Sequence, residues 1–317
     1  MALTLGDWLR VVSPHLTEPL FSKNAVRRLT GVASLLPGDC LSILETRLTP
    51  AGGPVDLSLR LRDRPEGLLP ATIWHELDLH RDFAGLPPPV VAARLDGDFD
   101  PLWLVDTLLP ALHGKPLQAG QRELVLSCCR RLPPGANLLY AFSLRARGKD
   151  QVRLEIGCNP DLATAYVGSF APDHAHRVER WATLLRRAER FHLSFDVGTD
   201  TSPRFGLEGS FSRQPAREPG WSEVFDDLEA AGLCTAEQRD AVFAWPGSAS
   251  FWSAPSDWPV TEVRTEGHLV RSLSHVKLVT LPDGAPEAKA YLALAYVGST
   301  GEASSARSRS RWVDSAS

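Results

Sequence analysis

The sequence predicts an α+β fold, an antiparallel β-barrel built from ααββ repeats with a ring of outer helices. Four pairs of segments with strand-like alternation recur along the 317 residues, and segments with helical periodicity separate them. Hairpins joined through helices give antiparallel strands, with the helices covering the apolar strand faces. Closing such a sheet removes its edges, and a barrel of eight or more strands can enclose a ligand. An open α+β sheet is the alternative.

The first repeat is expected to contain two short helices and two strands, at 4–13, 22–32, 38–48 and 54–62. Ser22 precedes the second helix as a candidate N-cap. Residues 68–100 are ambiguous, because TIWHELDL has the pattern of an additional strand and PPPVVAARL that of a short helix. We therefore expect eight or nine strands in all.

The other three repeats follow the same order. The second is expected at 101–113 and 119–132 (helices, with Pro110 ending or kinking the first) and 137–157 (two strands). The third combines a long amphipathic helix at 173–191 with strands at 192–198 and 203–211. The fourth has helices near 221–232 and 235–245 and strands at 268–281 and 287–297. Residues 1–298 are expected to form one domain, and 299–317, poor in apolar residues, a disordered tail.

Composition excludes several classes of function. A formal charge of −4 argues against non-specific nucleic-acid binding, and no apolar run is long enough to span a bilayer. The N-terminus lacks the features of a signal peptide, and five cysteines form neither a disulfide framework nor a metal-ligand spacing. We expect a cytoplasmic protein. Neither dinucleotide nor P-loop motifs occur, and His75 and His80 are five residues apart, so we expect no cofactor and no metal.

Charged side chains alternate with apolar ones along the predicted strands. Val55, Leu57 and Leu59 share one face of their strand, which leaves the other face polar. The polar faces contain Asp56, Ser58, Arg60, Arg62, Arg153, Glu155, His192, Ser194, Asp196, Arg204, Glu208, His275, Lys277, Lys289 and Tyr291. If helices cover the apolar faces, the polar faces line a chamber suited to an anion beside a group whose N–H or O–H needs an acceptor. Diphosphate next to an aromatic ring fits this description. Charges on the solvent face of an open sheet would show the same alternation.

Three short motifs resemble the aromatic prenyltransferases of the dimethylallyltryptophan-synthase type. The family's Gly-(Ser/Thr)-Pro-x-Glu-x-Ser pattern is similar to GGPVDLS at 52–58. Its Phe-Asp-Leu strand followed by Lys-x-Tyr is similar to SFDV at 194–197 followed by RFG at 204–206, and its late Lys and Tyr residues have counterparts in Lys277, Lys289 and Tyr291. The resemblance implies a barrel of ααββ repeats and metal-independent transfer of an allylic group.

The resemblance also implies roles for individual residues. Asp56 would accept the indole or phenol proton. The diphosphate would be bound by Arg60, Arg153, Arg204, Lys277, Lys289 and Tyr291, with Tyr291 also shielding the allylic cation. The acceptor is expected to contact Ser58, Glu155, Asp196, Glu208 and His275.

The chain departs from the family pattern at two of these positions. Asp56 replaces the family's Glu, and Gly206 stands where the family has a cation-shielding Tyr. Two functions therefore stay open. The first is an enzyme of natural-product biosynthesis that transfers an allylic group from a prenyl diphosphate to an indole, another aromatic or a Trp-containing peptide. The second is a non-catalytic protein on the same scaffold that binds a peptide or intermediate for partner enzymes of a peptide natural-product pathway.

Overall fold

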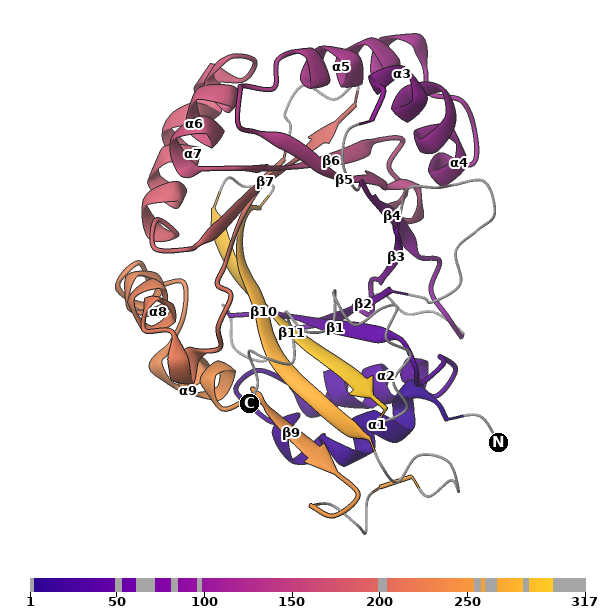
Figure 1. Cartoon of the computed structure of the whole chain (residues 1–317), viewed down its shortest axis with the longest axis vertical. Helices are drawn as coiled ribbons and strands as arrows, with labels where there is room; N and C mark the ends of the chain where they lie inside the picture. Colours follow the sequence, from indigo (N-terminus) through magenta and orange to yellow (C-terminus); the bar gives the residue numbers. More distant parts are fainter. Residues whose placement is uncertain are drawn as a thin grey trace.

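The computed structural model describes residues 3–48, 53–60, 72–80, 85–95, 99–198, 204–253, 258–259, 267–281 and 285–298. Within these ranges, ten strands pair in a closed antiparallel ring, as Figure 1 shows. In ring order they are β1 (Leu41–Arg47), β2 (Val55–Arg60), β3 (Thr72–Leu77), β4 (Val90–Arg94), β5 (Asn137–Ser143), β6 (Val152–Cys158), β7 (Arg190–Val197), β8 (Phe205–Ser210), β10 (His268–Thr280) and β11 (Pro286–Val297). Strand β11 pairs with both β10 and β1, which closes the ring, and β9 (Gly247–Ser250) extends β10 at its edge. The predicted barrel is confirmed.

The expected count of eight or nine strands was too low. TIWHELDL does form a strand, β3, but PPPVVAARL forms strand β4 and not the short helix that we expected. Five residues are too few to separate a period of two from one of 3.6 by pattern. Strand β4 pairs with β3 on one side and with β5 on the other, and these hydrogen bonds make the segment a strand.

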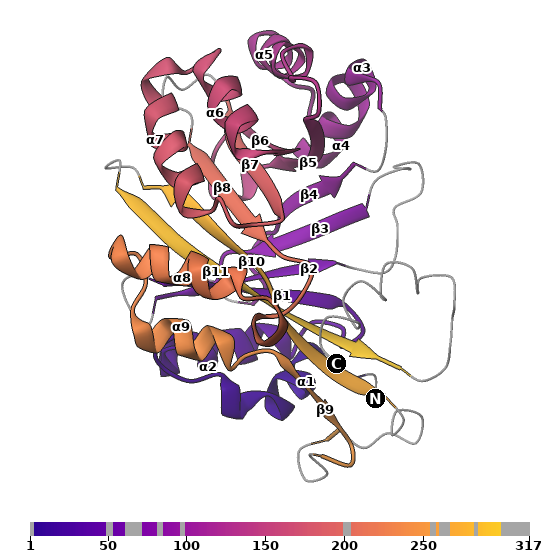
Figure 2. The ribbon, with the colours of Figure 1, turned by 60° about the vertical axis from the view of Figure 1, so that its left-hand side comes forward.

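Helices cover the outside of the ring, as Figures 1 and 2 show. Their bounds are α1 (Leu5–Val11), α2 (Lys23–Ala33), α3 (Pro101–Trp103), α4 (Leu109–His113), α5 (Ala119–Arg130), α6 (Pro160–Gly168), α7 (Pro172–Leu184), α8 (Gly220–Ala230) and α9 (Ala236–Phe243). A π-helical turn at Leu104–Leu108 joins α3 to α4 next to Pro110, the residue expected to disturb this helix. Side-chain caps at Thr4, Ser22 and Thr235 fix the starts of α1, α2 and α9.

The third repeat differs from its prediction in two ways. Helix α6 was not predicted, although Asn159 caps it and Pro160 occupies its first position. The helix expected at 173–191 ends at Leu184, and β7 already begins at Arg190. Residues 299–317, the expected tail, lie outside the described residues.

The apolar core lies between the ring and the helices. Leu44, Leu57 and Leu59, on the outer faces of β1 and β2, are buried together with Trp8 of α1 and Leu29 of α2. Two buried tryptophans of this layer have hydrogen-bond acceptors: Trp8 Nε1 donates to Gly38 O, and Trp245 Nε1 donates to Ala293 O. Because successive side chains alternate between faces, the remaining side chains of each strand point into the ring.

Candidate functional site

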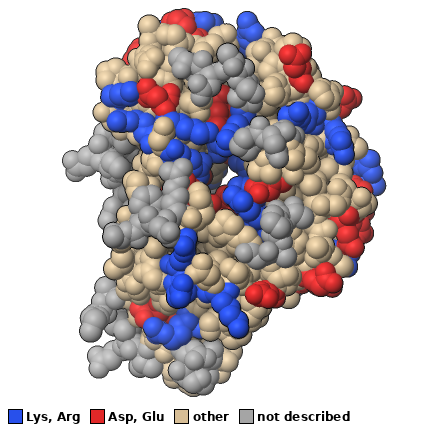
Figure 3. Space-filling model, turned by 180° about the vertical axis from the view of Figure 1, so that it is seen from behind, with Lys and Arg blue, Asp and Glu red and all other residues tan. Residues whose placement is uncertain are grey.

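The inner wall of the ring is lined by polar and aromatic side chains, as the alternation predicted. Cross-strand partners point to the same side of a sheet, and the observed register groups the inward residues into neighbouring pairs. Among these pairs are Glu45–Asp56, Ser58–Glu76, Phe142–Arg153, Arg153–Asp196, His192–Glu208, Lys277–Lys289 and His275–Tyr291. The rear face of the molecule is hollowed near its centre, and Lys, Arg, Asp and Glu side chains gather around this opening (Figure 3). Within the described residues, the polar faces therefore line a chamber.

Two of the predicted cations are already neutralised by carboxylates. Lys277 Nζ lies 2.5 Å from Glu208 Oε1, and Lys289 Nζ lies 2.5 Å from Glu45 Oε1. Tyr291 also donates to Glu45 Oε2 at 2.6 Å. Burial alone would raise the pKa of Glu45, but Lys289 and Tyr291 hold it at about 2. These residues form a compact ionic layer with little excess charge.

Excess positive charge lies instead where β6 begins and β7 ends. Arg153 donates to Asp196 Oδ1 at 2.7 Å, while Lys149 and the exposed Arg204 form no salt bridge among the described residues. Burial lowers the pKa of the Lys149 ammonium, and the neighbouring charge of Arg204 lowers it further. We call Lys149, Arg153 and Arg204 the mouth cations, because they lie at the end of the barrel where β6 begins and β7 ends. Two of them were predicted site residues, whereas Lys149, which lies in a loop before β6, has no alternation to identify it.

An aromatic surface adjoins the mouth cations. Trp74 packs against two interior apolar clusters, one with Phe142 and Tyr140 and the other with Ile43 and Tyr291. Its indole N–H has no hydrogen-bond partner within the described residues. Across strands β3 to β6 the register runs from Trp74 through Ala92 and Phe142 to Arg153. The aromatic surface therefore adjoins the mouth cations through Arg153.

Asp56, the predicted proton acceptor, lies at one end of β2. Its Oδ1 accepts a hydrogen bond from Leu79 N at 2.8 Å and lies 3.3 Å from His80 Nδ1. Ser58 shares its face, but Arg60 lies at the opposite end of the strand, beside Trp74. The structure thus does not bring Arg60 next to Asp56.

A second carboxylate, Glu76, faces the chamber across from Ser58 and two residues from Trp74. Burial raises the pKa of Glu76, and Arg147, 3.1 Å away, opposes that rise. Neither Glu76 nor Glu45 was among the predicted site residues. Glu76 shares its strand face with Thr72 and Trp74, so the alternation of TIWHEL could have indicated it. In LSILETR the face of Glu45 also carries Leu41 and Ile43, so alternation gives no signal for Glu45.

Glu155, Glu208 and His275, predicted acceptor contacts, lie close to His192. His192 Nδ1 is 3.1 Å from Glu155 Oε1 and 3.7 Å from Glu208 Oε2. Burial would lower the pKa of His192, but the two carboxylates raise it to about 10. Strands β6, β7, β8 and β10 thus bring together four ionisable side chains that are far apart in the sequence.

Gly206 has a structural explanation. A Cβ atom at this position would lie 2.6 Å from Ser194 Oγ and 2.7 Å from Lys277 Cε. The missing side chain therefore gives Lys277 the space through which it reaches Glu208. An aromatic residue here would displace Lys277.

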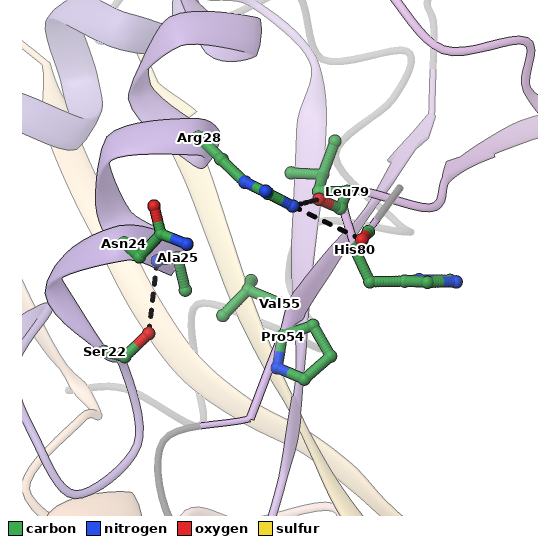
Figure 4. A pocket seen from close by; sticks show the side chains of 8 residues that line it. All are labelled: Ser22, Asn24, Ala25, Arg28, Pro54, Val55, Leu79 and His80. Carbon is green, nitrogen blue, oxygen red and sulfur yellow. Dashed lines mark hydrogen bonds between the residues drawn. The ribbon is translucent and has the colours of Figure 1, made fainter. Parts of the chain in front are cut away.

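A separate pocket of about 280 Å³ lies outside the ring, between α2 and the ends of β2 and β3 (Figure 4). Arg28 Nη1 donates to the carbonyl oxygens of Leu79 and His80 at its edge. It contains none of the predicted site residues.

The ionic layer predicts a pH dependence of stability. The pKa of Glu45 is about 2 in the folded protein and 4.5 when unperturbed, so the unfolded chain binds its proton first. Glu45 therefore contributes on the order of 3 kcal/mol to the free energy of unfolding above pH 4.5, and this contribution is lost as the pH falls towards 2. In urea unfolding, Glu45→Gln should be less stable than the wild type at pH 6, and the gap should narrow at pH 3. An equal difference in the free energy of unfolding between the two proteins at pH 6 and at pH 3 would contradict this interpretation.

Comparisons with known proteins identify the fold. Neither a protein-family model nor a curated protein matches the sequence. Among solved structures, the apo form of the prenyltransferase PriB superimposes with a TM-score of 0.50 over 92% of this chain and 96% of its own, at 12% identity. AnaPT from Neosartorya fischeri gives a TM-score of 0.48, covering 86% and 82%, at 11% identity. The chain has the prenyltransferase-barrel fold. No helix within the described ranges is long and apolar enough to cross a membrane.

Proposed function

Starting from this fold, we propose that the chain is an aromatic prenyltransferase, whose chamber binds a prenyl diphosphate and an aromatic acceptor. One observation carries the proposal: the mouth cations adjoin the aromatic surface around Trp74 and Phe142. A prenyl diphosphate has the same two parts, an anionic head and an apolar allylic chain. Cations bind the head by charge-assisted hydrogen bonds, and aromatic faces attract an allylic cation.

In the proposed reaction the allylic C–O bond breaks, and its electron pair leaves with the diphosphate. Lys149, Arg153 and Arg204 stabilise the negative charge that develops on the leaving group. A carbon of the acceptor ring donates its π electrons to the allylic cation, forming the new C–C bond. The ring then loses a proton to a carboxylate and regains its aromaticity.

Two carboxylates compete for the role of proton acceptor. Asp56 matches the family motif, but its Oδ1 already accepts from Leu79 N. Glu76 also accepts a hydrogen bond, from Arg147, but it lies two residues from Trp74 on the same strand face, and burial raises its pKa, which favours proton uptake. We propose Glu76 as the acceptor, with Asp56 as the second candidate.

Incubation with dimethylallyl diphosphate and indole, tryptophan or Trp-containing peptides, followed by mass spectrometry, tests the activity. We expect a product heavier than the acceptor by one prenyl group, and a loss of turnover of about a hundredfold or more in Glu76→Gln. The same loss in Asp56→Asn, with Glu76→Gln active, would assign the role to Asp56. Absence of product together with absence of diphosphate affinity would refute the proposal.

A non-catalytic binder is the second candidate function. The pairs Lys277–Glu208 and Lys289–Glu45 satisfy two predicted diphosphate ligands internally, which favours a ligand of lower charge, such as a peptide or pathway intermediate. Calorimetry separates the two functions. A binder should take up peptide without diphosphate, and the Glu76→Gln change should leave its affinity nearly unchanged.

A further inference from the structure

We propose that Glu155, His192, Glu208 and His275 form a binding site for a first-row divalent metal ion, with Zn²⁺ as the best match, on the inner wall of the barrel. The proposal does not depend on prenyl transfer. It rests on the distances between four ligand atoms, on the orientation of His275 and on the support around Glu208.

The ligand atoms have the separations that a metal ion requires. Zn–N and Zn–O bonds of about 2.0–2.2 Å at tetrahedral angles place neighbouring ligands roughly 3.4 Å apart. His192 Nδ1 is 3.1 Å from Glu155 Oε1 and 3.7 Å from Glu208 Oε2. One ligand atom from each of these three residues lies within 4.8 Å of those from the other two. His275 Nε2 lies 3.6 Å from the same Glu208 oxygen. One ion could therefore replace the contacts among Glu155, His192 and Glu208, and His275 would complete the set by moving towards that ion.

His275 is held in an orientation suited to ligation. Ser274 Oγ lies 3.0 Å from His275 Nδ1, and when Nδ1 donates to it, the lone pair of Nε2 faces Glu208. The imidazole ring also stacks on Tyr291, with 3.9 Å between the ring centroids. A hydrogen bond through the second ring nitrogen fixes metal-binding histidines in this way.

One carboxylate oxygen of Glu208 is available as a metal ligand. Lys277 occupies Oε1, which leaves Oε2 directed at the two histidines. A charged hydrogen bond to the non-ligating oxygen is a typical outer support of a carboxylate ligand. Metal binding displaces the proton that Glu155 and Glu208 hold on His192. The neutral imidazoles and two carboxylates then form the combination of nitrogen and oxygen ligands that Zn²⁺ accepts.

A second cluster, Asp56, Asp78 and His80, is less suitable. Both oxygens of Asp78 accept from Arg147, and Asp56 Oδ1 accepts from Leu79 N. Binding there would break existing hydrogen bonds, and its histidine is exposed. This cluster provides the matched control.

Co²⁺, a spectroscopic substitute for Zn²⁺, tests the proposal on the full chain after chelator treatment and dialysis. We expect one Co²⁺ per chain, visible absorption bands of a low-coordinate site, and displacement by Zn²⁺. His192→Gln and His275→Gln should each weaken binding by at least about tenfold to a hundredfold, whereas His80→Gln should bind as the wild type does. Near-ultraviolet circular dichroism verifies folding, and Glu155→Gln replaces any variant that fails to fold.

Two outcomes would overturn the proposal. The first is no stoichiometric Co²⁺ or Zn²⁺ binding by the folded wild type. The second is binding that survives His192→Gln and His275→Gln but is lost in His80→Gln, which would place the ion in the other cluster. Because no prenyl substrate is used, a negative result here leaves the proposed transfer reaction untouched.

Discussion

Replacing Glu208 by Gln is expected to destabilise the folded protein by about 3–5 kcal/mol, because it leaves a buried lysine without its counter-ion. The side chains of Lys277 and Glu208 are only 8% and 9% exposed, and the distance between Nζ and Oε1 is 2.5 Å. His192 and His275 also face this carboxylate. Urea unfolding followed by circular dichroism, in the presence of chelator, measures the change.

A double variant isolates the cause. Adding Lys277→Met to Glu208→Gln removes the unpaired charge, so we expect most of the lost stability to return. Glu223→Gln provides the exposed control, because Glu223 pairs with Arg187 at 2.7 Å with both side chains about half exposed. That change should cost less than about 1 kcal/mol. A double variant as unstable as Glu208→Gln would show that packing, not charge, dominates.

Removing two mouth cations is expected to abolish most diphosphate binding. In Lys149→Gln with Arg204→Gln, each lost charge should weaken the affinity for inorganic diphosphate by about tenfold to a hundredfold, the range of a charged hydrogen bond. Neither side chain forms a salt bridge within the described residues, so the fold should tolerate the change. Isothermal titration calorimetry at fixed ionic strength measures the affinity.

The matched control removes the same charge elsewhere. Lys23 on α2 and Arg180 on α7 are exposed on the outside of the barrel, and Lys23→Gln with Arg180→Gln also lowers the net charge by two. This control should bind diphosphate within about twofold of the wild type, because exposed charges are screened beyond about 10 Å. Equal losses in both double variants would indicate a general charge effect and contradict a site at the mouth.

Alternation along single strands predicted the architecture correctly because period two is a local property. In β2, Val55, Leu57 and Leu59 face the helices, and Asp56 and Ser58 face the chamber. Strand β4 was misjudged because its five residues are too short for periodicity, and its two neighbours supply the hydrogen bonds. Helix α6 was missed although Asn159 and Pro160 mark its start.

The alternation of side chains along each strand identified most of the inward residues, but it could not identify their partners. Lys277 and Lys289 were predicted to bind diphosphate, and the register places each beside a carboxylate, Glu208 or Glu45. Arg60 and Asp56 share a face, yet lie at opposite ends of β2. Lys149 comes from a loop, where no periodic signal exists.

The sequence alone determined that each of these strands has one apolar and one polar face, because alternation is a local property of the chain. Closure of the ring decided that the polar faces surround an interior. Only the tertiary structure decided where that interior has excess charge. Register and closure of the ring place strands that are distant in the sequence side by side, as when Tyr291 meets Glu45. The charge of a chamber depends on which cations meet which carboxylates, and that pairing is a property of the closed barrel.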